Sequence, residues 1–75
     1  MSNNEIALWL RDQARALRLR HENLFRVKAF RLAADAVQRL TRPIEELDRN
    51  TLAAVPGIGR KLAVTIESLA RDDGK

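Results

Sequence analysis

The stretch Val55-Pro56-Gly57-Ile58-Gly59-Arg60-Lys61 decides the fold expected for this 75-residue chain. Its two glycines stand two residues apart between helical patterns, and glycine lets the backbone turn tightly without a side chain in the bend. Gly59 opens the following helix, whose first amides have no acceptor within the helix. With the positive end of the helix dipole, these amides predict an anion site, and Arg60 and Lys61 add charge beside it. Ile58 is expected to enter the core and fix the turn.

Two interpretations fit this stretch: a phosphate-binding hairpin, and an ordinary turn between two helices. A Gly-x-Gly pair alone would favour the ordinary turn. The full pattern is narrower, because Leu62, Ala63 and Ile66 continue it at helical spacing after the basic pair. The complete stretch therefore favours the phosphate-binding hairpin.

The first half of the chain predicts two longer helices. Ser2 and Glu5 form a capping box for the first, which is expected to run to about Arg20. Asn23 is the expected N-cap of the second, which runs from about Leu24 to Leu40. The first helix has a buried stripe of Ile6, Leu10, Ala14 and Leu17, and a basic ridge of Arg11, Arg15 and Arg18 on another face.

The second helix is expected to turn one apolar face inward. The residues assigned to that face are Phe25, Ala29, Phe30, Ala33, Val37 and Leu40, and those assigned to the far side are Lys28, Arg31, Asp35 and Arg39. Helical geometry also places Arg26 on the apolar side, in the first turn. A long cation there must either reach solvent or meet an anion.

Two shorter helical segments complete the pattern. Thr41-Arg42-Pro43 ends the second helix, because proline disfavours helix for the residue before it. The segment 43–54 is expected to form a short helix broken near Asp48-Arg49-Asn50, and the last helix is expected over 60–71. Its predicted stripe is Leu62, Ile66 and Leu69, flanked by Ala63 and Ala70. The fold class is therefore all-α: a compact four-helix domain containing one hairpin motif.

Length and composition predict one domain over residues 1–75, and the abrupt end after a helical pattern suggests a fragment of a longer protein. A chain of this length buries about 60% of its unfolded surface. It has no cysteine and one histidine, which excludes thiolate metal sites and argues against zinc. With neither a signal peptide nor a membrane span, it is expected to be cytoplasmic and, in a bacterium, associated with the nucleoid.

The net charge of +4 is unevenly distributed. Residues 11–31 hold seven basic side chains against two acidic ones, whereas residues 32–75 hold seven of each. Such a basic concentration favours a polyanionic partner. A solvated helix surface kept soluble by arginine is the alternative.

Two separate motifs carry a resemblance to a known family. The pattern around the two glycines resembles the hairpin of helix-hairpin-helix DNA-binding motifs. The segment 23–35 is similar to the second helix of the N-terminal domain of family X DNA polymerases, which in bacteria reads Asn-Pro-Phe-Arg-Val-Arg-Ala-Tyr-Arg-x-Ala-Ala. The opening Asn4-Glu5-Ile6-Ala7 also fits, so that the resemblance covers essentially the whole chain. Similar domains occur in bacterial proteins without the polymerase part.

This resemblance implies a repair-associated domain that binds single-stranded or gapped DNA through its backbone, often near a 5′-phosphate, without reading the bases. It implies no required cofactor, although the carbonyls of Ala53, Val55 and Ile58 would hold a K⁺ or Na⁺ that bridges to a phosphate. A polymerase or nuclease domain, in the same chain or a partner chain, would accompany it. The residues expected at DNA are Gly57, Ile58, Gly59, Arg60, Lys61, Arg26, Lys28 and Arg31.

In the animal members of that family, the resembling domain is a lyase whose lysine forms a Schiff base with a sugar aldehyde. That position falls on Thr65, and neither a hydroxyl nor a guanidinium can replace a primary amine. The assisting tyrosine is Phe30 and the histidine is Phe25. Binding without catalysis is therefore expected, with no catalytic residue.

Two alternatives stay open. Lys61, about one helical turn from Thr65, would serve as a substitute lyase nucleophile. A protein-interaction domain on the same scaffold is suggested by Leu8 and Leu19, which lie off the apolar stripe of the first helix.

Overall fold

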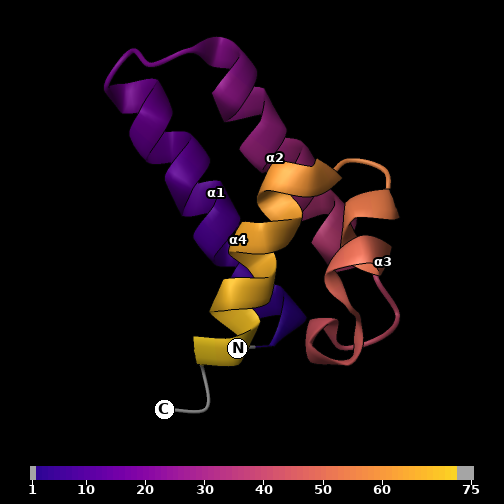
Figure 1. The fold of residues 1–75 in the computed structure, drawn as a ribbon. Helices are drawn as coiled ribbons and strands as arrows, with labels where there is room; N and C mark the ends of the chain where they lie inside the picture. The colour runs from indigo at the N-terminus through magenta and orange to yellow at the C-terminus, as the bar shows by residue number, and fades with distance from the viewer. Residues whose placement is uncertain (1, 73–75) are drawn as a thin grey trace.

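Two helical hairpins lie side by side in the computed structural model, which describes residues 2–72 (Figure 1). Every element within these residues is a helix, which confirms the all-α prediction. The first hairpin joins α1 (Asn3–Leu19) to α2 (Leu24–Arg39), and the second joins α3 (Arg49–Ala54) to α4 (Gly59–Asp72), with the short 3₁₀ helix η1 (Ile44–Glu46) between them.

The start of α1 is held by its own capping residues and by hydrogen bonds to the segment between the two hairpins. The capping box is confirmed, because Ser2 Oγ accepts from Glu5 N at 3.2 Å and Ser2 N donates to Glu5 Oε1 at 2.8 Å. The side chain of Asn3 donates to the carbonyl of Arg42 at 2.8 Å and accepts from the amide of Ile44 at 2.9 Å. These two bonds tie the first turn of α1 to the segment that leads into η1.

The core draws on every helical element. The largest fully buried side chains are Ile6, Leu10, Val37, Ile44, Leu52 and Ile66. The predicted stripe of α1 is buried throughout. In α4, Ala63, Ile66 and Ala70 are buried, whereas Leu62 and Leu69 are half-buried. The inward face of α4 is therefore rotated toward its alanines relative to the predicted stripe.

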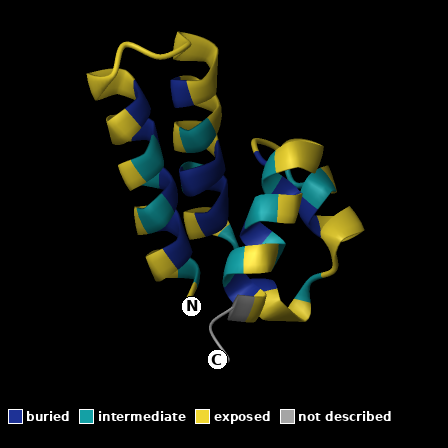
Figure 2. Ribbon diagram, turned by 60° about the vertical axis from the view of Figure 1, so that its left-hand side comes forward, coloured by how far each residue is buried: buried dark blue, intermediate teal, exposed yellow. Residues whose placement is uncertain are grey.

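The predicted inward face of α2 is partly wrong. Asn23 caps the helix as expected, accepting from Phe25 N at 2.8 Å. Yet the Phe25 side chain is 84% exposed and Ala29 is exposed, whereas Val27, Ala34 and Ala36, which were not predicted, are buried. The reason is that the second hairpin lies beside the C-terminal half of α2 and leaves the tip of the first hairpin exposed (Figure 2).

The basic ridge predicted on α1 and the far side predicted for α2 also need correction. Arg11 donates to Asp35 Oδ1 at 2.6 Å and to Gln38 Oε1 at 2.7 Å, and Arg11 and Asp35 are both half-buried. This contact joins α1 to α2. Arg11 is thus part of the packing between the helices, while Arg15 and Arg18 remain exposed.

The predicted break in the third helical segment is confirmed, and it falls at Leu47 and Asp48. Asp48 caps α3 by accepting from Thr51 N at 2.7 Å. This hydrogen bond favours the ionised carboxylate and lowers the pKa of Asp48 below its ordinary value. The cap sets where α3 begins, and therefore where the bend into α4 falls.

The bend between α3 and α4 has the backbone expected from its glycines. Gly57 has φ +98° and Gly59 has φ +73°, in the region that favours glycine. Ile58 is only 4% exposed, which confirms that it enters the core. A Cβ on Gly57 would lie 3.1 Å from the carbonyl oxygen of Leu32 and 3.4 Å from Ala36 Cβ, so the bend rests directly on α2.

The two glycines provide a matched test of this packing. Both Gly57→Ala and Gly59→Ala force a positive φ on a side chain, which costs about 1–2 kcal/mol of the free energy of unfolding. We expect Gly57→Ala to cost more, because its Cβ also meets the Leu32 carbonyl, whereas no atom lies within 4 Å of a Cβ on Gly59. Urea unfolding measures both; an equal or larger loss in Gly59→Ala would contradict the close approach.

Candidate nucleic-acid interface

Most residues of the bend are exposed, and most of their backbone amides lack an acceptor within the described residues. Gly57, Gly59, Arg60 and Lys61 are all exposed. The amide of Ile58 donates to the carbonyl of Val55 at 3.1 Å, and among the described residues no acceptor is found for the amides of the other four. Unpaired amides at the start of a helix, where the helix dipole is positive, attract an anion.

Two of the cations predicted to contact DNA, Arg26 and Lys61, line one groove on the α2 side of the bend. Its cavity of about 300 Å³ is lined by Arg26, Ala29, Phe30, Lys61, Leu62 and Thr65. No lining residue is acidic. Arg26 was expected on the apolar side of α2, and it is exposed beside half-buried Phe30. We name this space the α2 groove.

A second groove lies on the α3 side of the bend. It encloses about 260 Å³ and is lined by Arg49, Asn50, Ala53, Arg60 and Val64. Arg60 and Lys61 are neighbours in sequence, yet each lines a different groove. We name this space the α3 groove.

The other two predicted side-chain contacts do not line the grooves at the bend. Lys28 and Arg31 are exposed on α2, but they line neither groove. None of the ion pairs found within residues 2–72 involves Arg26, Arg60 or Lys61. The cations nearest the bend are therefore available to an external anion, and their role at DNA stays a prediction.

The carbonyl set implied for a monovalent cation belongs to this same bend. Val55 O already accepts the Ile58 amide, which leaves its second lone pair, and Ala53 lies in the last turn of α3, where carbonyls lack intrahelical partners. Neutral carbonyl oxygens suit K⁺ or Na⁺. Within residues 2–72, no group of three or more His, Cys, Asp or Glu side chains is placed to hold a metal ion. A monovalent cation at the carbonyls of Ala53, Val55 and Ile58 stays a prediction.

Phe25 is a surface residue that the sequence analysis placed in the core. Phe25, Ala29 and Leu32 follow at spacings of four and three, so they share one face of α2. Phe25 is 84% exposed and Leu32 is 46% exposed, and the strip ends where Gly57 approaches Leu32. Arg26 and Lys28 lie between Phe25 and Ala29 in sequence. An aromatic residue next to cations at the start of a helix was the sequence signal that could have indicated an exposed Phe25.

Thr65, on which the resemblance to the lyase domains places the catalytic lysine, lines the α2 groove. It is half-buried, and its hydroxyl donates to the carbonyl of Lys61 at 3.4 Å. Phe30 in the same groove has no hydroxyl. The groove therefore offers cations for a phosphate, and its one primary amine belongs to Lys61.

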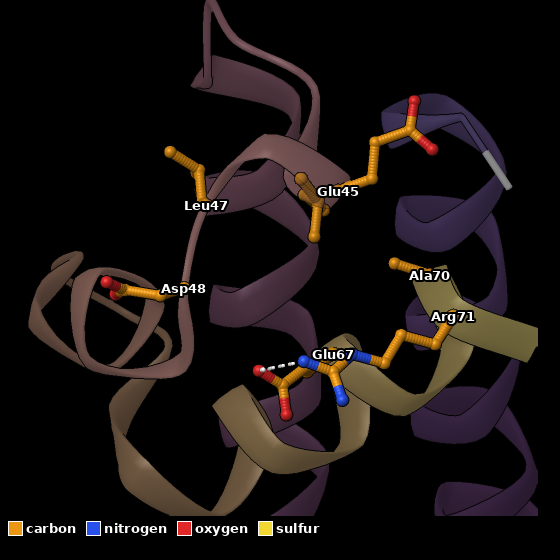
Figure 3. Close-up of a pocket in the computed structure, with 7 residues that line it drawn as sticks. Glu45, Leu47, Asp48, Glu67, Ala70 and Arg71 are labelled. Atoms are coloured by element: carbon orange, nitrogen blue, oxygen red, sulfur yellow. Dashed lines mark ion pairs between the residues drawn. The ribbon is translucent and has the colours of Figure 1, made fainter.

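Acidic side chains gather away from the bend. Glu45, Asp48 and Glu67 line a cavity of about 200 Å³ between η1 and the C-terminal end of α4, where Glu67 Oε2 lies 3.7 Å from Arg71 (Figure 3). The bend lies at the opposite end of α4. This separation of charge leaves the bend basic.

Leu8 and Leu19 are exposed, at 60% and 72%. They are eleven residues apart on α1, which corresponds to about 16 Å along the helix. Two single leucines at that separation form no continuous apolar patch. The protein-interaction alternative thus gains no support from them.

Comparison with known proteins identifies one match. The model of the family described as "Helix-hairpin-helix domain" matches residues 1–73 of the 75. No curated protein and no solved structure matches the chain. Helix-hairpin-helix domains generally bind DNA without sequence specificity. No helix within the described residues combines the length and apolar character that a membrane crossing requires.

Proposed function

We propose that this chain, which belongs to the helix-hairpin-helix domain family, binds DNA by holding backbone phosphates at the bend 56–61. The observation that carries the proposal is that four exposed residues of the bend, Gly57, Gly59, Arg60 and Lys61, have amides without an acceptor, and two of these residues are cations. Contacts to phosphate fix the position of a protein on DNA but carry no base information. Binding is therefore independent of sequence and falls steeply with salt.

The α2 groove is suited to a terminal 5′-phosphate. Arg26 and Lys61 come from different helices and line one cavity without a competing carboxylate. A terminal phosphate carries more charge than a bridging one, so two converging cations favour it. A K⁺ or Na⁺ on the carbonyls of Ala53, Val55 and Ile58 would add a further positive charge at the bend.

The exposed strip on α2 favours DNA with unpaired bases. Aromatic side chains stack on bases of any sequence, and each stacked base contributes about 1–3 kcal/mol to binding. Phe25 is available for such stacking only where a base is not already paired. Single-stranded or gapped DNA, as found during repair, is thus the proposed ligand, with a polymerase or nuclease domain as a companion.

Lys61→Gln tests the phosphate contact. We expect it to weaken binding to a 5′-phosphorylated gapped duplex roughly fivefold, the effect of one exposed charge pair. The slope of log affinity against log salt should decrease by about 0.7–0.9, since one fewer counterion is released. Fluorescence anisotropy measures both quantities. The matched control is Arg42→Gln, which removes a positive charge beside Glu46, away from both grooves; equal losses in the two variants would refute a specific contact.

Phe25→Ala tests the preference for unpaired bases. Because the side chain is solvent-exposed, its loss should leave the free energy of unfolding nearly unchanged. Affinity for single-stranded DNA should fall by about fivefold or more, and affinity for intact duplex should change little. Leu8→Ala, another exposed apolar truncation, should affect neither ligand. A parallel loss for single strand and duplex in Phe25→Ala would argue against stacking.

We also propose that the α2 groove binds without lyase catalysis, since Thr65 stands where the amine is needed. Borohydride treatment with an incised abasic duplex should trap no covalent adduct with the unmodified chain. Thr65→Lys, which puts a primary amine in the groove, should create one. If the unmodified chain were trapped and Lys61→Gln abolished the trapping, Lys61 would be a nucleophile and the domain a lyase.

A further inference from the structure

The α3 groove is basic without being part of the terminal-phosphate site. It is lined by two arginines and one amide side chain, with Ala53 and Val64 completing its wall. No carboxylate is among its lining residues. Arg60 enters it from α4, whereas Arg49 and Asn50 enter from α3.

Arg49 is held in place by a carboxylate outside the groove. Its Nε and one terminal nitrogen donate to Glu67 Oε1, at 3.2 Å and 2.9 Å. The Glu67 side chain is only 13% exposed, and its other oxygen lies 3.7 Å from Arg71. One anion is thus shared by two cations, and Arg60 adds a cation for which no ion pair is found within residues 2–72.

We propose that the α3 groove is a second phosphate subsite, and that a single DNA strand crosses the bend from one groove to the other. This inference rests on the proposed function and deepens it. Arg60 and Lys61 differ by 100° around α4, which directs them into the two grooves. The amides of Gly57 and Gly59 lie between them. One phosphate then sits in each groove, and one sits at the amides.

The subsite selects phosphate through hydrogen-bond geometry as well as charge. A guanidinium presents a planar fork of donors that matches a phosphate in a bidentate manner. Because Glu67 already accepts from two nitrogens of Arg49, that side chain is pre-oriented, and exposed Arg60 is the second cation that contacts the phosphate. Asn50 adds a neutral donor.

Substitution of single phosphates locates each subsite on the strand. The ligand is a 5′-phosphorylated oligothymidylate in which one bridging phosphate at a time is replaced by a neutral methylphosphonate. Affinities of the whole chain and of Arg60→Gln are measured for each oligonucleotide, with Lys61→Gln in parallel and Arg42→Gln as the charge control.

We expect Arg60→Gln to weaken binding roughly fivefold and to reduce the salt slope by about 0.7. In Arg60→Gln, one methylphosphonate position should cause no further loss of affinity, because the side chain that contacts that phosphate is already missing. In Lys61→Gln, a different methylphosphonate position should cause no further loss of affinity. Such non-additivity identifies groups that touch. Arg60→Lys, which keeps the charge without the fork, should restore the salt slope and only part of the affinity.

Each contrary result has a distinct meaning. If the unmodified chain fails to bind the oligothymidylate and a gapped duplex, the proposed function itself is wrong. If binding occurs but Arg60→Gln matches Arg42→Gln, or couples to the same phosphate as Lys61→Gln, the second subsite is refuted while phosphate binding at the bend stands. An acidic peptide that displaces the DNA equally from the unmodified chain and from Arg60→Gln would likewise refute the subsite.

Discussion

The close approach of the bend to α2 determines the rest of the structure. Gly57 lies against the Leu32 carbonyl, which a Cβ would approach to 3.1 Å, and Ile58 is buried in the core. Together these contacts fix the first turn of α4 relative to α2. The same contact sets the α2 groove on one side of the bend, whereas the α3 groove on the other side lies between α3 and α4. A bend that rested less closely on α2 would not define the α2 groove.

Charge is separated along the molecule in part because several acidic groups have structural roles. Asp35 pairs with Arg11 across the first hairpin, and Glu67 pairs with Arg49 and Arg71 in the second. Asp48 is used as a helix cap. The remaining cations at the bend have no acidic neighbour within either groove. The interface is thus basic because these acidic side chains form ion pairs and a helix cap elsewhere in the fold.

The sequence was sufficient for features that depend on neighbouring residues. Caps at Ser2 and Asn23, the stripe of α1 and the hairpin with buried Ile58 follow from local geometry, and the structure confirms them. The inward face of α2 was not predictable in this way, because it depends on which half of the helix the second hairpin covers. Exposed Phe25 is the consequence.

The same distinction, between features set by neighbouring residues and features set by long-range packing, applies to the candidate site. The amides of the bend could be inferred from two glycines and a helix start. The separation of Arg60 from Lys61 could not, since it requires the position of α3 relative to α4, which is set by long-range packing. The contact between Arg11 and Asp35 likewise joins residues that are far apart in sequence.

The central claim is that the exposed amides of the bend bind a phosphate oxygen. Its most direct test is a titration of the ¹⁵N-labelled chain with a 5′-phosphorylated gapped duplex at low salt, followed by amide chemical shifts. We expect the largest shifts at Gly57, Gly59, Arg60 and Lys61, and we expect them to disappear as salt is raised. Binding that leaves these four amides unmoved while shifting others would contradict the account.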